Sequence, residues 1–381
     1  MRAQADTALS GPTGPDDRID PGELRRAHAS LDAMLVGLVS RDGSDLHLTV
    51  GAPPSVRVHG RLRPLDGYGD LTEADLLLLA RVAAGEERWA RFVREHELDF
   101  VYTISGLARF RANLFVQRGR CAAVFRAVPE RIRGLAELDL PEALARFAAL
   151  PRGLVLVTGP TGSGKSTTLA ALLDLANRTR DGHIVTIEDP IEFLHRHDRC
   201  LINQREIGAD TDSYATALRQ SLRQDPDIIM VGELRDLETT ATALTAAETG
   251  HLVFATLHTH SAAHTVDRVI DVFPAGQQAQ VRTQLAAALQ GVAAQALCPR
   301  ADGAGRTVLM ELMFTTPAIR ALIREGKTHQ IPQFVQSGAA DGMVSFDRHL
   351  ADRVRAGLVA YGQALELCHS PENFQHLMGR A

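Results

Sequence analysis

Apolar and polar residues alternate over short runs in the first third of the chain. Asp45–Val50 and Ser55–His59 alternate with a period of two, which is typical of half-buried antiparallel strands. A helix is expected from Pro21. Further helices are expected near 72–84 and 86–96, and further strands around 100–104, 110–116 and 122–127. These patterns predict a small α+β domain over residues 23–131.

A linker-like stretch runs from Pro129 to Gly134, and a different pattern follows it, so a second domain is expected over residues 132–381. Buried strand-like runs now alternate with helical runs, which predicts a parallel sheet with crossover helices. From about residue 316 the helical patterns are broken by Pro332 and Ser337, which indicates a C-terminal helical subdomain. The fold class expected for 132–381 is therefore α/β.

The first 22 residues are rich in Gly, Pro, Asp and Ser and contain little apolar surface. Such a segment cannot bury enough area to offset the entropy lost on ordering, so we expect a disordered tail. No apolar run approaches the roughly 18 residues of a membrane span, and the start of the chain is unlike a signal peptide. A soluble chain that docks on a membrane machine through a partner is expected.

The composition of the chain argues against several kinds of partner and of metal site. The chain has 381 residues, 45% of them hydrophobic, and a net charge of −5, which disfavours both a disordered scaffold and a whole-surface attraction to nucleic acid. The cysteines are far apart and form no C-x-x-C pair: Cys121, Cys200, Cys298 and Cys368. Neither a structural zinc site nor a disulfide framework is expected, and a reducing cytoplasm fits best.

One motif carries most of the functional information. It is the G-x-x-x-x-G-K-[ST] phosphate loop, made of Gly159, Pro160, Thr161, Gly162, Ser163, Gly164, Lys165 and Ser166. It lies between a strand-like run over 154–157 and a helix-like run over 168–173, a context that favours a nucleotide site over a glycine-rich turn. Lys165 would reach the β and γ phosphates, and the Ser166 hydroxyl would hold Mg²⁺.

Two acidic strand ends accompany the loop. The apolar run from Asp227 ends at Glu233, the Walker B arrangement, and we expect Glu233 to be the general base. The alternative is a solvated acid that merely ends a strand. A second acidic stretch carries Glu188 and Glu192, which face the same cleft if both strands share a parallel sheet.

Histidines bracket the next apolar strand. His251 precedes 252–257 and His258 follows it, so only His258 belongs naturally at the carboxyl edge. His258 could sense the γ-phosphate, or it could be a structural residue. The nearby His260 and His264 also allow a metal site, which the lack of a matched acid or cysteine disfavours.

Arginines gather on the last strands of the first domain: Arg109, Arg111, Arg118, Arg120 and Arg126. They form either a solvated basic face, a nucleic-acid groove, or a set of side chains offered in trans to the nucleotide of a neighbouring subunit. Few aromatic residues are interleaved with them and the net charge is acidic. We therefore favour the third interpretation.

Taken in order, these motifs resemble the type IV pilus retraction ATPases, the PilT branch of the secretion ATPase superfamily. The likeness runs from about Leu31 to Phe374. It includes the phosphate loop, the acidic box Thr186–Glu192, the Walker B run and the histidine box from Thr249 to Thr259. The resemblance implies a RecA-like P-loop ATPase domain, a PAS-like N-terminal domain and C-terminal helices. It also implies a homohexamer that binds ATP between subunits.

The resemblance assigns roles to particular residues. Gly159 to Thr167 would bind phosphate and Mg²⁺, with Ser166 on the metal and Glu192 reaching it through water. Glu188 would support the same site, Glu233 would be the catalytic acid, and His251 and His258 would form the histidine pair. Arg111 and Arg126 match the arginines that reach a neighbour's phosphates.

The resemblance also implies an activity and a location. The stretch Ala318–Glu325 is similar to the AIRNLIRE motif of retraction motors, with Ala321 in place of Asn, and the zinc subdomain common in assembly and secretion ATPases is missing. We therefore expect a motor for pilus retraction and twitching motility, at the cytoplasmic face of the inner membrane. It would bind a membrane platform protein and no nucleic acid directly. The alternatives are an accessory retraction paralogue, an assembly or secretion ATPase and, less favoured, a nucleic-acid translocase.

Overall fold

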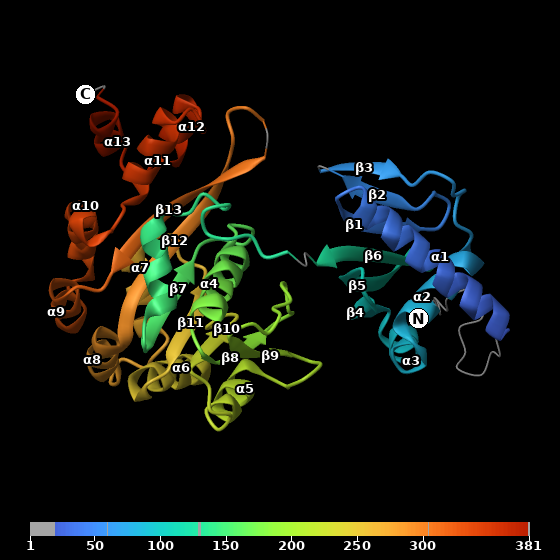
Figure 1. Ribbon diagram of the computed structural model, residues 1–381, viewed down its shortest axis with the longest axis horizontal. Helices are drawn as coiled ribbons and strands as arrows, with labels where there is room; N and C mark the ends of the chain where they lie inside the picture. The colour runs from blue at the N-terminus through green and yellow to red at the C-terminus, as the bar shows by residue number, and fades with distance from the viewer. Residues whose placement is uncertain (1–19, 59, 129–130, 304, 380–381) are drawn as a thin grey trace, which may run out of the picture. The chain divides into compact units, whose positions relative to one another are not determined.

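The computed structural model describes residues 20–58, 60–128, 131–303 and 305–379. The chain divides into two compact units, Met1–Glu130 and Arg131–Ala381, each with its own hydrophobic core (Figure 1). Most of the expected N-terminal tail lies outside the described residues. The helix expected from Pro21 begins there, within the last two residues of the segment 1–22, because Asp20 caps it and Pro21 suits its first position.

The first unit is a six-stranded antiparallel sheet covered on one face by helices. Along the chain it contains α1 (Pro21–Ser40), β1 (Gly43–Thr49), β2 (Ser55–Val58), β3 (Arg61–Pro64), α2 (Glu73–Ala84), α3 (Glu86–Glu95), β4 (Glu97–Ile104), β5 (Ala108–Gln117) and β6 (Arg120–Val128). The strand order is β3-β2-β1-β6-β5-β4. Strand β3 was not expected, because all four of its residues are exposed and show no apolar alternation.

Strand β5 shows how this sheet separates its two faces. Buried Phe110 and Leu114 alternate with half-buried Arg109 and Arg111, so the apolar side chains pack beneath the helices and the arginines lie on the opposite face. A reciprocal capping box between Thr72 and Asp75 begins α2, one of the covering helices.

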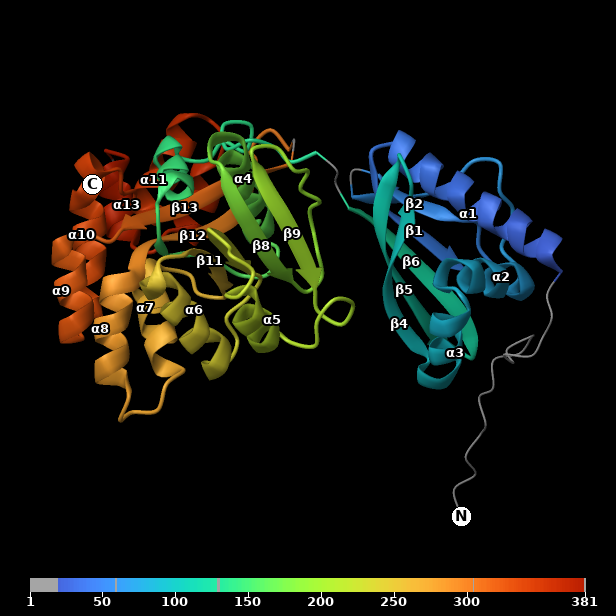
Figure 2. The ribbon, with the colours of Figure 1, turned by 60° about the horizontal axis from the view of Figure 1, so that its bottom comes forward.

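The second unit is a seven-stranded sheet with helices on both faces (Figure 2). Its strands are β7 (Gly153–Thr158), β8 (Gly182–Glu188), β9 (Cys200–Glu206), β10 (Ile228–Val231), β11 (Leu252–Leu257), β12 (Leu289–Pro299) and β13 (Arg306–Phe314). The order is β13-β12-β7-β11-β10-β8-β9, and every neighbouring pair is parallel except β12 with β13. The antiparallel β13 is a departure from the simple alternation that the sequence predicts.

The direction in which the chain crosses the sheet decides on which face each crossover helix lies. These are the α-helices α4 (Lys165–Thr179), α5 (Tyr214–Ser221), α6 (Leu237–Thr249), α7 (Ala262–Asp271) and α8 (Gln278–Ala288), while the 3₁₀ helix η1 (Glu142–Ala149) precedes the first strand, β7, and packs against α4. The connection through α4 crosses the sheet in one direction and those through α5 to α8 return. Right-handed crossovers therefore place α4 on one face and the others on the opposite face.

The chain ends in a group of short helices. They are α9 (Pro317–Glu325), η2 (Thr328–Gln330), α10 (Ile331–Ser337), η3 (Gly338–Asp341), α11 (Phe346–Arg355), α12 (Tyr361–Leu367) and α13 (Pro371–Leu377). Helix α11 packs against β13, and a small separate core that includes Leu309 and Phe374 holds the last helices together. The predicted C-terminal helices are thus present.

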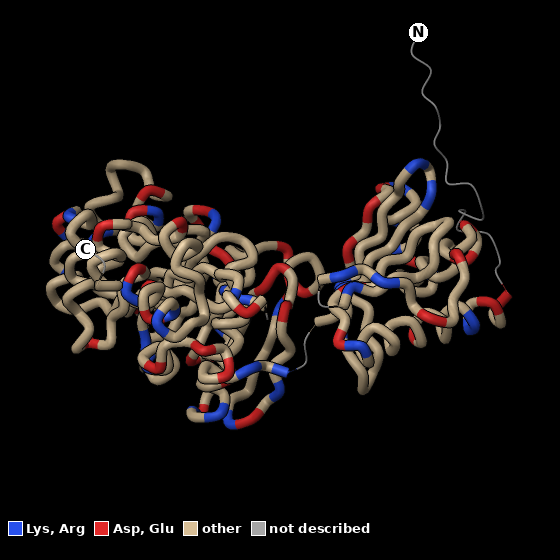
Figure 3. The backbone as a smooth tube through the Cα atoms, turned by 90° about the horizontal axis from the view of Figure 1, so that it is seen from above, with Lys and Arg blue, Asp and Glu red and all other residues tan. Residues whose placement is uncertain are grey.

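Acidic and basic residues are interspersed along both units (Figure 3). The described residues contain no helix long and apolar enough to cross a membrane. All four cysteines are free thiols.

Candidate nucleotide site

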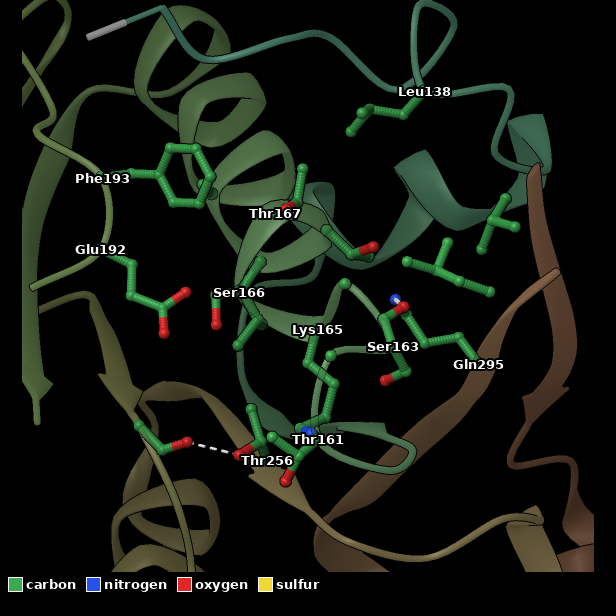
Figure 4. Close-up of a pocket in the computed structure, with 18 of the residues that line it drawn as sticks. Leu138, Thr161, Ser163, Lys165, Ser166, Thr167, Glu192, Phe193, Thr256 and Gln295 are labelled. Carbon is green, nitrogen blue, oxygen red and sulfur yellow. Dashed lines mark hydrogen bonds between the residues drawn. The ribbon is translucent and has the colours of Figure 1, made fainter. Parts of the chain in front are cut away.

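A cavity of about 870 Å³ opens in the second unit where four parallel strands end. It is lined by the loop after β7, the start of α4 and residues that follow β8, β10 and β11 (Figure 4). Of the residues expected at the site, the lining includes Thr161 to Thr167, Glu188, Glu192, Glu233 and His258. Sequence reasoning thus placed separate motifs at one edge of the sheet, and the register brings them together.

The phosphate loop requires glycine at particular positions. Gly159 has a φ of +143°, and a Cβ there would lie 2.1 Å from the carbonyl oxygen of Gln295. Gly162 and Gly164 also have positive φ values, of +78° and +89°. Because Gly164 is the N-cap of α4 and has no side chain, the first N–H groups of the helix keep no side-chain cap. This end of α4 therefore suits an anionic ligand.

Lys165 curls back over the loop. Its Nζ donates hydrogen bonds to the carbonyl oxygens of Gly159, at 2.9 Å, and Pro160, at 3.1 Å. Burial lowers the pKa of Lys165, and the nearby carboxylates of Glu233 and Glu192 partly oppose that shift. The Lys165 ammonium group and the backbone N–H groups of the loop can both bind the oxygen atoms of a polyphosphate.

Glu188 is the last residue of β8 and is only 8% exposed. Its Oε1 accepts hydrogen bonds from Thr186 Oγ1 at 2.7 Å and from Gln204 Nε2 at 3.0 Å. Burial raises the pKa of Glu188, although these hydrogen bonds favour the ionised form. The side chain is therefore held in place by neighbouring strands.

Glu192 faces the start of α4. Figure 4 shows its carboxylate and the Ser166 hydroxyl directed toward one another. A hydroxyl and a carboxylate are hard oxygen donors of the kind that Mg²⁺ prefers, with water completing the shell. Among the described residues no group of three or more His, Cys, Asp or Glu could hold a metal by itself. The donor set fits Mg²⁺ only as an ion that shares its ligands with phosphate and water.

Glu233 follows β10 and lies between Arg235 and His258. Its Oε2 accepts a hydrogen bond from Arg235 Nε at 2.8 Å, and its Oε1 lies 3.1 Å from His258 Nε2. The Glu233 side chain is 18% exposed and that of His258 is 46% exposed. Both side chains therefore border the cavity where a ligand can reach them.

His251 lies elsewhere. It precedes β11 at the amino edge of the sheet, the opposite end from His258, and it is not among the residues that line the cavity. Its Nδ1 is 3.0 Å from the carbonyl oxygen of Ala246, near the end of α6. The structure thus places only one member of the expected histidine pair at the cavity.

Arg111 and Arg126 belong to the first unit, where they are paired directly across β5 and β6. Like charges in that register repel one another. The buried Asp45 carboxylate on β1 offsets this, because it accepts a hydrogen bond from Arg126 Nε at 2.7 Å. Burial alone would raise the pKa of Asp45, but hydrogen bonds from Ser44 and Arg126 hold it below its usual range.

Several lining residues carry no sequence signal for a phosphate site. They are Phe193, Tyr214, Thr256, Gln295, Arg300 and Arg306. Arg235 also lines the cavity, but it could have been found from the sequence, because it lies two residues after Glu233. Gln295 comes from the distant strand β12, so nothing local in the sequence connects it with the loop.

Comparison with known proteins places the chain among secretion ATPases. Residues 132–304 match the family described as type II/IV secretion system protein. The chain is 49% identical over 341 residues to the type IV pilus retraction ATPase PilT of Pseudomonas aeruginosa, covering 90% of this chain and 98% of the relative. It is 41% identical over 328 residues to the type IV pilus ATPase PilU of the same organism, covering 86% of each.

A solved structure agrees with these sequence matches. The crystal structure of the pilus retraction motor PilT with bound ADP has a TM-score of 0.85 and 43% identity, covering 91% of this chain and 98% of that one. This likeness confirms the predicted fold class.

Replacing Glu188 by glutamine tests the cost of its burial. Burial raises the pKa of Glu188 in the folded protein above its usual value of 4.5. The folded protein therefore loses stability as the pH rises from 4.5 through the folded-state pKa, because the buried carboxyl group must then ionise. We expect Glu188→Gln to gain stability relative to the parent chain as the pH increases from about 5 to about 8. Thermal denaturation without nucleotide measures this, with Glu238→Gln as the matched control, because the Glu238 side chain on α6 is exposed. A constant difference across that range would contradict the assignment.

Proposed function

Because the chain belongs to the PilT family of type IV pilus retraction ATPases, we propose that it is a hexameric, Mg²⁺-dependent motor that powers pilus retraction. Such a motor would couple ATP hydrolysis to domain movements that withdraw pilin subunits from the fibre, which produces twitching motility. The observation that carries this proposal is that Lys165 and Glu233 lie near one another in the lining of one cavity at the phosphate loop.

We assign nucleotide binding to the loop and the first turn of α4. The N–H groups of Thr161 to Thr167 would surround the phosphates, and Lys165 would leave the carbonyl oxygens of Gly159 and Pro160 to contact them. Mg²⁺ held by the Ser166 hydroxyl, and through water by Glu192, would offset negative charge on the transferring phosphoryl group. The retraction motor PilT has been crystallised with bound ADP, which supports nucleotide as the ligand.

We assign the catalytic step to Glu233. Its carboxylate would orient a water molecule and accept its proton, with Arg235 and His258 fixing the two carboxylate oxygens. Glu188 would hold the loop after β8 that carries Glu192, because the Glu192 backbone nitrogen donates a hydrogen bond of 3.5 Å to Glu188 Oε2. His251 lies at the far end of β11, so its contribution would pass through the strand without contact to nucleotide.

Arg111 and Arg126 would complete the pocket of a neighbouring subunit. Both lie on the open face of the first unit's sheet, and neither is part of the second unit. An arginine supplied in trans can neutralise charge that develops in the transition state, so hydrolysis would depend on how neighbouring subunits close. This dependence gives a reason for a hexameric ring. The ring would act at the cytoplasmic face of the inner membrane on a platform protein, without direct contact to nucleic acid.

Helix α9 supports retraction over assembly. It contains the stretch Ala318–Glu325, and its Arg320 Nη1 donates to the carbonyl oxygens of Ala286, at 2.6 Å, and Ala287, at 2.8 Å, at the end of α8.

A second candidate function is that of an accessory retraction ATPase. The chain's 41% identity to a second relative, the type IV pilus ATPase PilU, is compatible with a role beside another pilus ATPase.

Glu233→Gln should bind nucleotide but hydrolyse it about 10² to 10⁴ times more slowly, the usual contribution of a positioned general base. The amide can still accept the hydrogen bond from Arg235, so binding should be retained. Phosphate release and the Kd for ATP measure the two effects. Glu238→Gln, whose carboxylate pairs with Arg219 on the surface, is the matched control and should behave as the parent chain does. Equal turnover in Glu233→Gln would remove Glu233 as the base.

Mixing two inactive variants tests whether subunits share a site. Arg111→Ala leaves its own phosphate loop and Glu233 intact, whereas Glu233→Gln leaves Arg111 intact. Mixed rings of these two chains should therefore regain part of the ATPase activity. Lys165→Ala mixed with Glu233→Gln is the control, because no mixed interface would then contain an intact pocket. If the first mixture stays as inactive as the control, Arg111 does not act in trans.

Deletion of the gene in its host should leave cells with excess surface pili and no twitching, because fibres form but are not withdrawn. Electron microscopy of pili and a twitching assay measure this. A plasmid copy should restore both properties, and a copy with Glu233→Gln should not. Bald cells would instead identify an assembly motor, and near-normal retraction would support the accessory alternative.

A further inference from the structure

Gln295 connects strand β12 to the phosphate loop. Its side chain is buried, with 3% exposure, and its Nε2 donates a hydrogen bond of 2.6 Å to the carbonyl oxygen of Ser163 (Figure 4). A Cβ placed on Gly164 would lie 3.2 Å from the same Nε2, and one on Gly159 would lie 2.1 Å from the Gln295 carbonyl oxygen. Both the side-chain amide and the backbone carbonyl group of Gln295 therefore pack against the phosphate loop.

The hydrogen bond to Ser163 sets the direction of a neighbouring N–H group. The peptide between Ser163 and Gly164 is planar and trans, so its carbonyl oxygen and its N–H point to opposite sides. The carbonyl is held inward by Gln295, and the N–H of Gly164 consequently points away from Gln295, toward the cavity that Gly164 lines. A reversed peptide would instead present a carbonyl oxygen to the phosphates and repel them.

The oxygen atom of the Gln295 side-chain amide also supports a role for its Nε2 as a donor to the loop. Gln295 Oε1 is buried and has no hydrogen-bond partner among the described residues. An unsatisfied buried acceptor is unfavourable, and an apolar side chain of similar shape would avoid it. The donor function toward Ser163 is therefore the one polar interaction that this side chain supplies.

We infer that Gln295 is a positioning residue for the nucleotide reaction, which holds the Ser163–Gly164 peptide with its N–H directed at the polyphosphate. The inference rests on the proposed function, since it needs the loop to bind nucleotide. It goes further in giving β12 a part in the site: a shift of this strand would turn a phosphate donor toward the cavity or away from it.

Two substitutions separate this role from simple packing. Gln295→Met keeps the length of the side chain and removes the donor, and Gln295→Glu keeps the shape but places an acceptor against the Ser163 carbonyl. Gln290→Met is the matched control, because Gln290 lies on the same strand and its amide contacts Ala288 and Arg320. Each variant is compared with the parent chain for thermal stability and for the Kd of ADP and of AMP.

Both Gln295 variants should weaken ADP binding about 10- to 100-fold, the range for a lost hydrogen bond to a charged group, and should change AMP binding much less. Gln290→Met should leave the ratio of the two Kd values unchanged even if it lowers the melting temperature. If Gln295→Met or Gln295→Glu folds and keeps the parental ratio, Gln295 does not orient the loop. Failure of the parent chain to bind ADP would refute the proposed function itself, before Gln295 is tested.

Discussion

The parallel register of β7, β11, β10 and β8 is the constraint on which the site depends. In this register Thr158 is opposite Leu257, and Val231 is opposite both Ala255 and Ile187. The strands therefore end together, and the next residues in each chain segment are the phosphate loop, His258, Glu233 and Glu188. These strands are buried on both faces, so a slip in pairing would disturb the core as well as the site.

Charge at this edge is balanced between acidic and basic groups that touch one another. Lys165 lies near Glu233 and Glu192, and Glu233 also contacts Arg235 and His258. These contacts lessen the cost of holding charged side chains in a partly desolvated cavity. An anionic ligand would change several of them together, since Lys165 now bonds to the loop's own carbonyl oxygens.

The separation of the chain into two units has a chemical consequence. The loop, the acids and His258 belong to the second unit, whereas Arg111 and Arg126 belong to the first. Asp45 holds Arg126 on its sheet, and the repulsion between the paired arginines favours a negatively charged partner for Arg111. Under the proposed function that partner is the nucleotide of another subunit, which would make hydrolysis sensitive to movement between units.

Much of the fold and of the site was predictable, because local patterns carry it. Alternation with a period of two located the strands of the first unit, and only β3 was missed, since an exposed edge strand has no buried face. In the second unit, the phosphate loop and the acids at strand ends were found because parallel strands leave their carboxyl ends at one edge. The departure in the second unit was the antiparallel β13.

The sequence by itself determined the identity of the phosphate loop and of the acids at strand ends. Glycine conformation and strand termination act over a few residues, so both can be recognised locally. Only the tertiary structure decided that Arg111 is opposite Arg126 and that Gln295 reaches Ser163 across 132 residues of sequence. Such contacts depend on strand order and register, which are set by packing of the whole sheet.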